Sequence, residues 1–214
     1  MKTDDLIRAL AADLDGMSPR NALRPLWADL VLATAVMAVP SFAVIWFGLA
    51  RSPHLAHGLG LTLGTTVAAA GLLGAGALAA VAAAARPEAR LRTGWAVIPA
   101  LLMAGGIVVE LARAGTGGWW QRLVGDQPLA CLACVFLLSL PMLGGMLLAL
   151  RRGAPARPRA TGAMAGLAAG GFAAAMYTLH CPEGSLMFIA AWHIPAILLV
   201  ASLGAWAGGR LLRW

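Results

Sequence analysis

Long apolar runs alternate with short charged segments along this chain, a pattern typical of polytopic membrane proteins. The runs cover about residues 28–50, 59–85, 93–112, 129–150, 161–179 and 186–208. At about 1.5 Å of rise per residue, each run is long enough to cross a hydrocarbon core of roughly 30 Å. The pattern therefore predicts an all-α membrane protein with six transmembrane helices within residues 26–214.

Composition supports a membrane protein and argues against a nucleic-acid-binding one. The chain is 60% hydrophobic and 12% charged, with a mean hydropathy of +0.80; soluble proteins carry roughly 25% charged residues. The net charge of +7 comes from arginines at the ends of apolar runs and not from one basic patch. This placement indicates membrane orientation, so we expect a lipid bilayer and no direct nucleic-acid contact.

The distribution of lysine and arginine predicts the topology. Thirteen of these 16 residues fall on one side of the predicted spans, including both terminal segments, and three, Arg51, Arg113 and Arg122, fall on the other. Short loops rich in Lys and Arg stay in the cytoplasm. The first residues carry both signs of charge and contain no apolar core, so no cleavable signal peptide is expected. We expect a multi-pass protein of the bacterial inner membrane with both termini in the cytoplasm.

Residues 1–25 are predicted to form a short amphipathic cytoplasmic helix and a linker. Leu6, Ile7, Leu10 and Leu14 recur at helical spacing, with Asp13 and other acids on the remaining faces. A helix of about 13 residues is marginal alone in water, so it needs a surface for its apolar stripe. Lipid, the cytoplasmic loops and a protein groove are the alternatives. The acidic face disfavours the anionic inner leaflet and favours a basic protein partner.

Three cysteines are predicted at the outer membrane face. Cys131 and Cys134 form a Cys-Leu-Ala-Cys motif at the start of the fourth run, and Cys181 follows His180 between the last two runs. Three sulfurs and an imidazole suit Cu(I), Zn(II) or Cd(II). A Cys131–Cys181 disulfide is equally compatible with an oxidising periplasm, either as a redox switch or as a permanent structural bridge. The residues alone leave these alternatives open.

The remaining polar groups give no sign of an enzyme. Glu110 and His193 lie within apolar runs and are candidates for polar coupling between spans. No Ser/His/Asp, paired-carboxylate or phosphate-loop arrangement is present. Glycines spaced four apart predict close helix packing and would permit self-association into a homo-oligomer. They are Gly60 and Gly64, Gly162, Gly166 and Gly170, and Gly204 and Gly208.

Several segments resemble the NrsF-type anti-sigma factors, which are six-span inner-membrane proteins. The segments are the opening Met1-Lys-Thr-Asp-Asp-Leu-Ile-Arg-Ala-Leu-Ala-Ala-Asp-Leu14, the periplasmic Cys131, Leu150-Arg-Arg-Gly-Ala-Pro155 and Leu179-His-Cys-Pro-Glu183. The resemblance implies a protein that sequesters an extracytoplasmic-function (ECF) sigma factor and releases it under heavy-metal or related stress. It also implies that Cys131 and Cys181 are the sensing positions, while Cys134 has no assigned role.

Residue pattern and resemblance combine into one hypothesis with two competitors. In the hypothesis, the stripe from Leu6 to Leu14 binds the sigma factor, and the outer cysteines control its release, with a metal ion acting as a signal and no cofactor required. A membrane thiol-disulfide oxidoreductase would need a quinone pocket and usually a second cysteine pair. A heavy-metal transporter would need ligands near the bilayer midplane and at the cytoplasmic mouth, where the chain has few.

Overall fold

The computed structural model describes residues 3, 5, 26–48, 60–84, 94–114, 117–153, 155–181 and 183–212. Within these ranges the chain is helical and contains no strand. The elements are α3 (Leu26–Gly48), α4 (Leu61–Ala84), the 3-10 turn η2 (Gly94–Ala96), α5 (Val97–Ala114), α6 (Trp119–Val124), α7 (Pro128–Leu150), α8 (Pro158–Thr178) and α9 (Leu186–Leu211). The predicted N-terminal stripe, Leu6, Ile7, Leu10, Asp13 and Leu14, lies outside the described residues.

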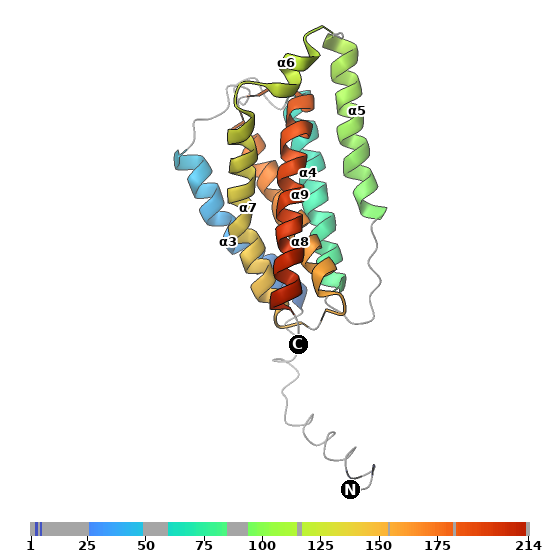
Figure 1. The fold of residues 1–214 in the computed structure, drawn as a ribbon, viewed down its shortest axis with the longest axis vertical. Coiled ribbons are helices and arrows are strands. Elements are labelled where there is room, and N and C mark those ends of the chain that lie inside the picture. Colours follow the sequence, from blue (N-terminus) through green and yellow to red (C-terminus); the bar gives the residue numbers. More distant parts are fainter. Residues whose placement is uncertain are drawn as a thin grey trace.

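The long helices coincide with the six apolar runs and alternate in direction through the bundle (Figure 1). Among the described residues, four helical stretches are long and apolar enough to cross a membrane: Thr62–Ala84, Gly94–Arg113, Trp119–Leu150 and Leu186–Leu211. Trp27–Ala43 is a shorter apolar helix. The all-α fold is confirmed for the described residues, and the length and apolarity of these helices agree with a membrane protein. The number of six spans and their orientation stay predictions.

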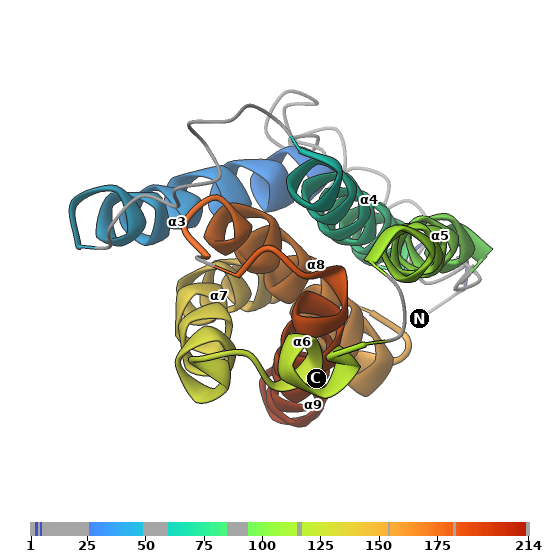
Figure 2. The same cartoon turned by 90° about the horizontal axis from the view of Figure 1, so that it is seen from above.

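Helix α8 lies at the centre of the bundle, between α4, α7 and α9 (Figure 2). Its glycines lie against the backbone of α9: a Cβ added at Gly166 would be 2.6 Å from the Cα of Ala201, and one added at Gly208 would be 2.9 Å from the Cα of Gly162. In lipid, such small faces let helices approach until their backbones touch. The predicted packing role of the glycines on α8 and α9 is confirmed. At Gly60 and Gly64, an added Cβ would meet no atom of the described residues within 4 Å, so the close packing predicted there is not seen.

Helices α3 and α7 are joined by polar contacts along their length. The Ser41 hydroxyl donates a hydrogen bond of 2.9 Å to the Leu138 carbonyl, one turn before Pro141. Asp29, in the first turn of α3, forms an ion pair of 3.3 Å with Arg152, which lies just after the end of α7. A change in the position of α7 would therefore act directly on α3.

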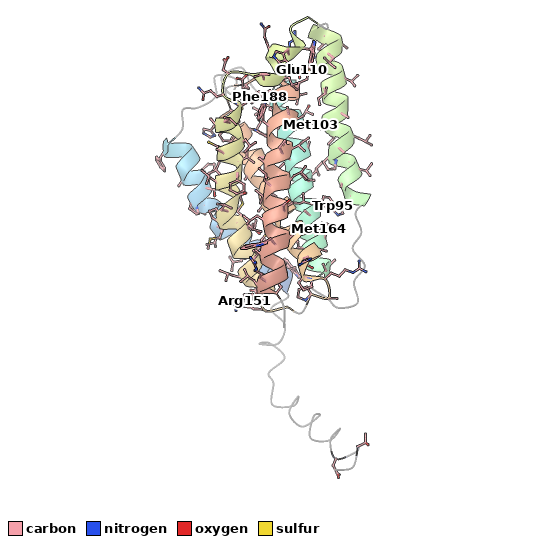
Figure 3. The ribbon with its side chains drawn as sticks, viewed as in Figure 1. Trp95, Met103, Glu110, Arg151, Met164 and Phe188 are labelled. Carbon is pink, nitrogen blue, oxygen red and sulfur yellow. The ribbon has the colours of Figure 1, made fainter. Side chains whose placement is uncertain are left out.

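Helix α5 lies at the edge of the bundle beside α4 (Figure 2). Only 11% of its membrane-length window is buried inside the protein. Trp95, just before α5, packs against Gly76 of α4, and Met103 lies on the side facing the bundle (Figure 3). The apolar residues on its other side would face lipid.

Candidate functional site

The two cysteines singled out by the resemblance meet at one end of the bundle. Cys131 lies in the first turn of α7, where its N–H donates to the Gln127 carbonyl at 3.2 Å. Cys181 lies in the turn after α8, and its N–H donates to the Tyr177 carbonyl at 3.0 Å. Their sulfur atoms are 3.7 Å apart, and the two side chains are 1% and 2% exposed. The two cysteines are 50 residues apart in the sequence, and the packing of α7 on α8 and α9 brings them together.

The two sulfurs are not bonded to each other, but they lie close to disulfide distance. All three cysteines are free thiols in the structure. An S–S bond is about 2.05 Å long, so modest movement of α7 toward the α8–α9 turn would bring the sulfurs into bonding range. Cys134 is half-exposed, nearly one helical turn further along α7. The arrangement can therefore carry out reversible two-electron thiol oxidation between Cys131 and Cys181.

Tyr177 completes the environment of the pair. Its hydroxyl donates to the Cys131 sulfur at 3.5 Å, and its ring centroid lies 5.9 Å from that of His193 on α9. Sequence reasoning missed this residue. The available signal was that Tyr177 is the single tyrosine of the chain and stands four residues before Cys181.

The Cys181 thiol is held in its protonated form. Its hydrogen bond with Cys131 raises the pKa of Cys181, and burial raises that pKa further. Because alkylating reagents react with the thiolate, Cys181 should react slowly at neutral pH.

Glu110 links α5 to the start of α9 at this same end (Figure 3). One carboxylate oxygen accepts a hydrogen bond of 2.7 Å from the Ser185 hydroxyl, and the other accepts one of 2.6 Å from the Leu186 N–H. Ser185 is the N-cap of α9, and its hydroxyl accepts from the Phe188 N–H. A carboxylate at the positive end of the helix dipole stabilises α9 where the chain leaves Cys181.

The segment between α6 and α7 is tied to the same region. The Asp126 N–H donates to the Glu183 carboxylate at 2.9 Å, and the Trp192 indole donates to the Leu123 carbonyl at 3.0 Å. Gly125 has a φ of +58°, and an added Cβ there would collide with the Phe188 ring. Glycine is therefore required at this position for both backbone and space. These contacts fix the approach to Cys131 relative to the turn that carries Cys181.

Two histidines lie near the pair in different settings. His180, in the turn before Cys181, is buried, with 6% of its surface exposed. Its backbone N–H donates a hydrogen bond to the Tyr177 carbonyl. His193 is buried within α9 beside Tyr177. Among the described residues, no three His, Cys, Asp or Glu side chains converge closely enough to hold a metal ion. Metal binding by Cys131, Cys134, Cys181 and His180 stays a prediction.

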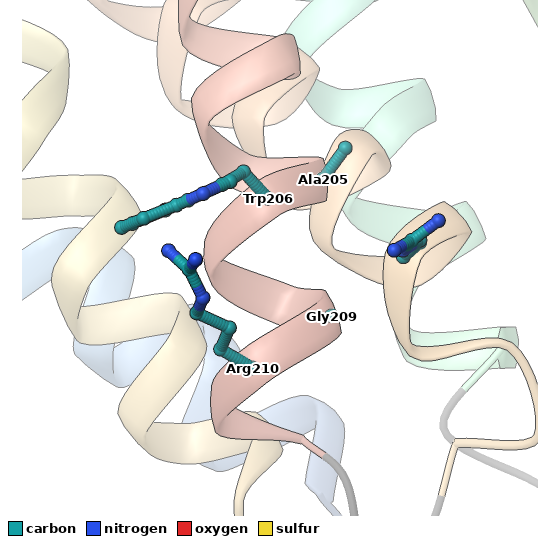
Figure 4. A pocket seen from close by; sticks show the side chains of 5 residues that line it. Ala205, Trp206, Gly209 and Arg210 are labelled. Atoms are coloured by element: carbon teal, nitrogen blue, oxygen red, sulfur yellow. The ribbon is translucent and has the colours of Figure 1, made fainter.

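The opposite end of the bundle is basic. A recess of about 440 Å³ is lined by Arg159, Ala205, Trp206, Gly209 and Arg210 (Figure 4). The Arg210 guanidinium lies 4.1 Å from the centroid of the Trp206 ring, a cation–π contact. Arginine and tryptophan together are typical of a membrane–water interface.

Comparison with known families agrees with the resemblance. The family model described as "Negative regulator of sigma F", NrsF, matches residues 10–214. The chain belongs to the NrsF family. It is 35% identical over 219 residues to the anti-sigma-F factor NrsF of Caulobacter vibrioides, covering all of both chains. It is 31% identical over 223 residues to the probable anti-sigma-F factor NrsF of Azospira oryzae, again over all of both chains. No solved structure matches this NrsF chain significantly.

Proposed function

We propose that this chain is a membrane anti-sigma factor that holds an ECF sigma factor inactive and releases it when stress reaches the outer membrane face. Membership of the NrsF family and the names of its two relatives support the regulatory role. The single observation that carries the sensing step is the contact of the Cys131 and Cys181 sulfurs at 3.7 Å.

The proposed topology has six spans in the bacterial inner membrane, with both termini in the cytoplasm. The described helices support it: Arg151, Arg152, Arg157, Arg159 and Arg210 gather at one end of the bundle. Arg113 and Arg122 lie at the other end, with the thiol pair. By the positive-inside rule, the first end faces the cytoplasm. The thiols then face the periplasm, where oxidants and metal ions arrive first.

The partner-binding element of the proposal is the N-terminal segment. The apolar stripe of Leu6, Ile7, Leu10 and Leu14 would fill a hydrophobic groove on the sigma factor, and Asp13 would meet a basic residue at its edge. The predicted linker joins this segment to α3, which begins at Leu26. Its position would therefore depend on the position of α3.

The signal in this proposal is a covalent or metal bridge between the two thiols. On oxidation, each sulfur loses its hydrogen, one S–S bond forms, and a periplasmic oxidant takes up two electrons and two protons. A soft or borderline metal ion, such as Cu, Zn or Cd, would draw the same two sulfurs together without a change of redox state. Either event moves the start of α7 toward the α8–α9 turn.

A chain of contacts connects this movement to the cytoplasmic side. Helix α7 runs from the thiol pair to the basic end, where Arg152 pairs with Asp29 of α3, and midway Ser41 of α3 bonds the Leu138 carbonyl. Movement of α7 would thus shift α3 and the N-terminal segment joined to it. Such coupling requires two arrangements of α3 against α7, one for each state of the thiols.

Co-purification of the sigma factor with the full-length chain tests the proposal. We expect the intact protein to retain an ECF sigma factor and Leu10→Asp to lose it, because a charge at the centre of the stripe cannot be buried. Ala12→Asp, on the opposite face of the same predicted helix, is the matched control and should retain the partner. Absence of a sigma factor from the intact protein, or equal retention by Leu10→Asp, would refute the proposed interface.

A further inference from the structure

An apolar cavity of about 300 Å³ lies between α4, α5, α8 and α9. Its walls are formed mainly by aliphatic side chains and by Pro99 and Met103 of α5. The lining on the remaining helices includes Leu73, Leu167, Ile189 and Ile197. Since α5 is exposed over most of its surface, a molecule dissolved in the bilayer could reach this space from the side. An engineered cavity of about 150 Å³ accepts benzene, so this space is large enough for a substituted six-membered ring.

Among the polar side chains that line this cavity, His193 is the one without a hydrogen-bond partner in the described part of the chain. Its side chain is 3% exposed, and within the described part of the chain neither ring nitrogen has a hydrogen-bond partner. The other polar lining residue, Thr66, already donates its hydroxyl to the Thr62 carbonyl at 2.8 Å. An unsatisfied buried polar group destabilises the folded state. A ligand with a carbonyl oxygen would satisfy one of the two ring nitrogens by accepting the imidazole N–H.

The same imidazole borders the thiol pair. The His193 ring is 5.9 Å from the Tyr177 ring, and the Tyr177 hydroxyl donates to the Cys131 sulfur. The His193 imidazole also lies close enough to the Cys131 sulfur for a weak polar interaction, although no hydrogen bond of standard geometry joins them. One side of His193 thus faces an empty apolar space, and the other faces a redox-active dithiol.

We propose that the cavity binds the head ring of a lipid-soluble quinone, which oxidises the Cys131–Cys181 pair. The proposal rests on the proposed function, because it names the oxidant to which the sensor responds. The apolar walls favour the ring, the His193 N–H binds a carbonyl oxygen, and the isoprenoid tail extends past α5 into lipid. A purely aliphatic occupant, such as a lipid acyl chain, would leave His193 unpaired.

The proposed step is balanced. Two S–H bonds break and one S–S bond forms between Cys131 and Cys181, while the quinone accepts two electrons and two protons and leaves as the hydroquinone. His193 positions the quinone and passes one proton to the carbonyl oxygen that it bonds. The resulting hydroquinone is reoxidised in the membrane, so the thiols would report how oxidised the quinone pool is.

The test uses the full-length protein, reduced, in lipid nanodiscs under anaerobic conditions, with a short-chain ubiquinone analogue as the probe. Hydroquinone is followed by absorbance and the Cys131–Cys181 bridge by mass spectrometry of tryptic peptides. We expect one hydroquinone per bridge. His193→Phe should slow the reaction about tenfold, as expected for loss of one hydrogen bond in an apolar site.

Variants of α5 separate reaction in the cavity from reaction at the protein surface. Ala100 lines the cavity and is partly exposed, so Ala100→Phe fills the space at small cost to folding and should block oxidation by the quinone. Ala104→Phe, on the same helix and outside the lining, is the matched control and should react like the wild type. No bridge with the quinone, or equal rates in Ala100→Phe and the wild type, would overturn the proposal.

An experiment with diamide, a soluble thiol oxidant, tests the quinone site separately from the proposed sensing function. A bridge formed by diamide that releases the sigma factor, together with no reaction with the quinone, would refute the quinone site and leave the sensor intact. A diamide-formed bridge that leaves the sigma factor bound would refute the sensing function itself. A bridge formed by both oxidants, with the quinone reaction alone sensitive to Ala100→Phe, would support both.

Discussion

Helices α8 and α5 are held in the bundle in opposite ways. Helix α8 is rich in alanine and glycine and is buried against α4, α7 and α9, with backbones in direct contact. Helix α5 is strongly apolar but mostly unburied, and its clearest polar attachment is the hydrogen-bonded Glu110 at one end. In lipid, apolarity does not draw helices together, and small complementary surfaces do. The less hydrophobic helix is therefore the better packed one.

This difference divides the molecule into a closely packed frame and a peripheral helix. The frame of α7, α8 and α9 holds the Cys131 and Cys181 sulfurs at 3.7 Å, and small shifts of its members change that distance. Helix α5 closes one side of the cavity beside His193, and little of its surface is buried in the bundle. Each prediction below alters one of these two parts, beginning with the largest expected effect.

A leucine at Gly166 should damage the frame most. Its Cβ would already overlap the backbone of Val200 and Ala201, so α8 and α9 would have to separate, at a cost of about 3 kcal/mol or more. We expect a large fall in the melting temperature of the detergent-purified protein and in its membrane accumulation. Gly144→Leu is the matched control, because an added Cβ there meets nothing within 4 Å. Similar melting temperatures for the two variants would show that the backbone contact is dispensable.

Replacing either sensing cysteine should abolish the response without harming the frame. In Cys131→Ser and in Cys181→Ser no bridge can form, so a sigma-dependent reporter should stay repressed when oxidant or metal is added. Repression without stress should be unchanged, because serine fits the space of cysteine. Cys134→Ser should respond normally, since the sulfur contact joins the other two residues. A full response in both single variants would show that Cys131 and Cys181 do not sense the stress.

Loss of Glu110 should loosen the peripheral helix and leave the frame folded. Glu110→Ala removes the acceptors for Ser185 and Leu186, with an expected cost of about 1–3 kcal/mol. Amide hydrogen exchange should accelerate at the start of α9 and along α5 but not in α8. Glu110→Gln keeps one acceptor oxygen and should show a smaller change. Equal exchange in the alanine variant and the wild type would mean that this link does not hold α5.

The smallest predicted effect is on the reactivity of one thiol. The pKa of Cys181 is raised chiefly by its hydrogen bond with Cys131, so Cys131→Ser should lower it toward the ordinary value. In a Cys134→Ser background, the pH at which maleimide labels Cys181 at half its maximal rate should therefore fall when Cys131 is also replaced. An unchanged or higher midpoint would contradict the hydrogen-bonded pair.

Much of the helical framework could be predicted from the sequence, because apolar runs of this length leave few other structures. Helix α7 begins and ends within one residue of the predicted 129–150, and α9 begins at the predicted residue 186. The glycine spacing also predicted close packing of α8 and of α9, but not that these two helices contact each other. The fifth run, 161–179, is rich in alanine and glycine and forms the central helix α8, because small residues suit a helix surrounded by others.

The rotation of each helix about its axis could not be predicted, and the site depends on it. Helices that are apolar on all sides give no periodic signal of which face is inward. Consequently the Tyr177 hydroxyl bond to Cys131, the Glu110 cap on α9 and the cavity beside His193 became visible only in three dimensions. Cysteine identity alone indicated Cys131, Cys134 and Cys181 equally, and the resemblance singled out Cys131 and Cys181 as the sensing positions.

The central claim is that the thiol pair at one membrane face controls a sigma factor held at the other. The most direct measurement is the amount of sigma factor retained by the full-length protein before and after a Cys131–Cys181 bridge is formed and verified by mass spectrometry. The account predicts retention in the reduced state, release on bridging, and renewed retention after reduction. Full retention by the bridged protein would contradict it.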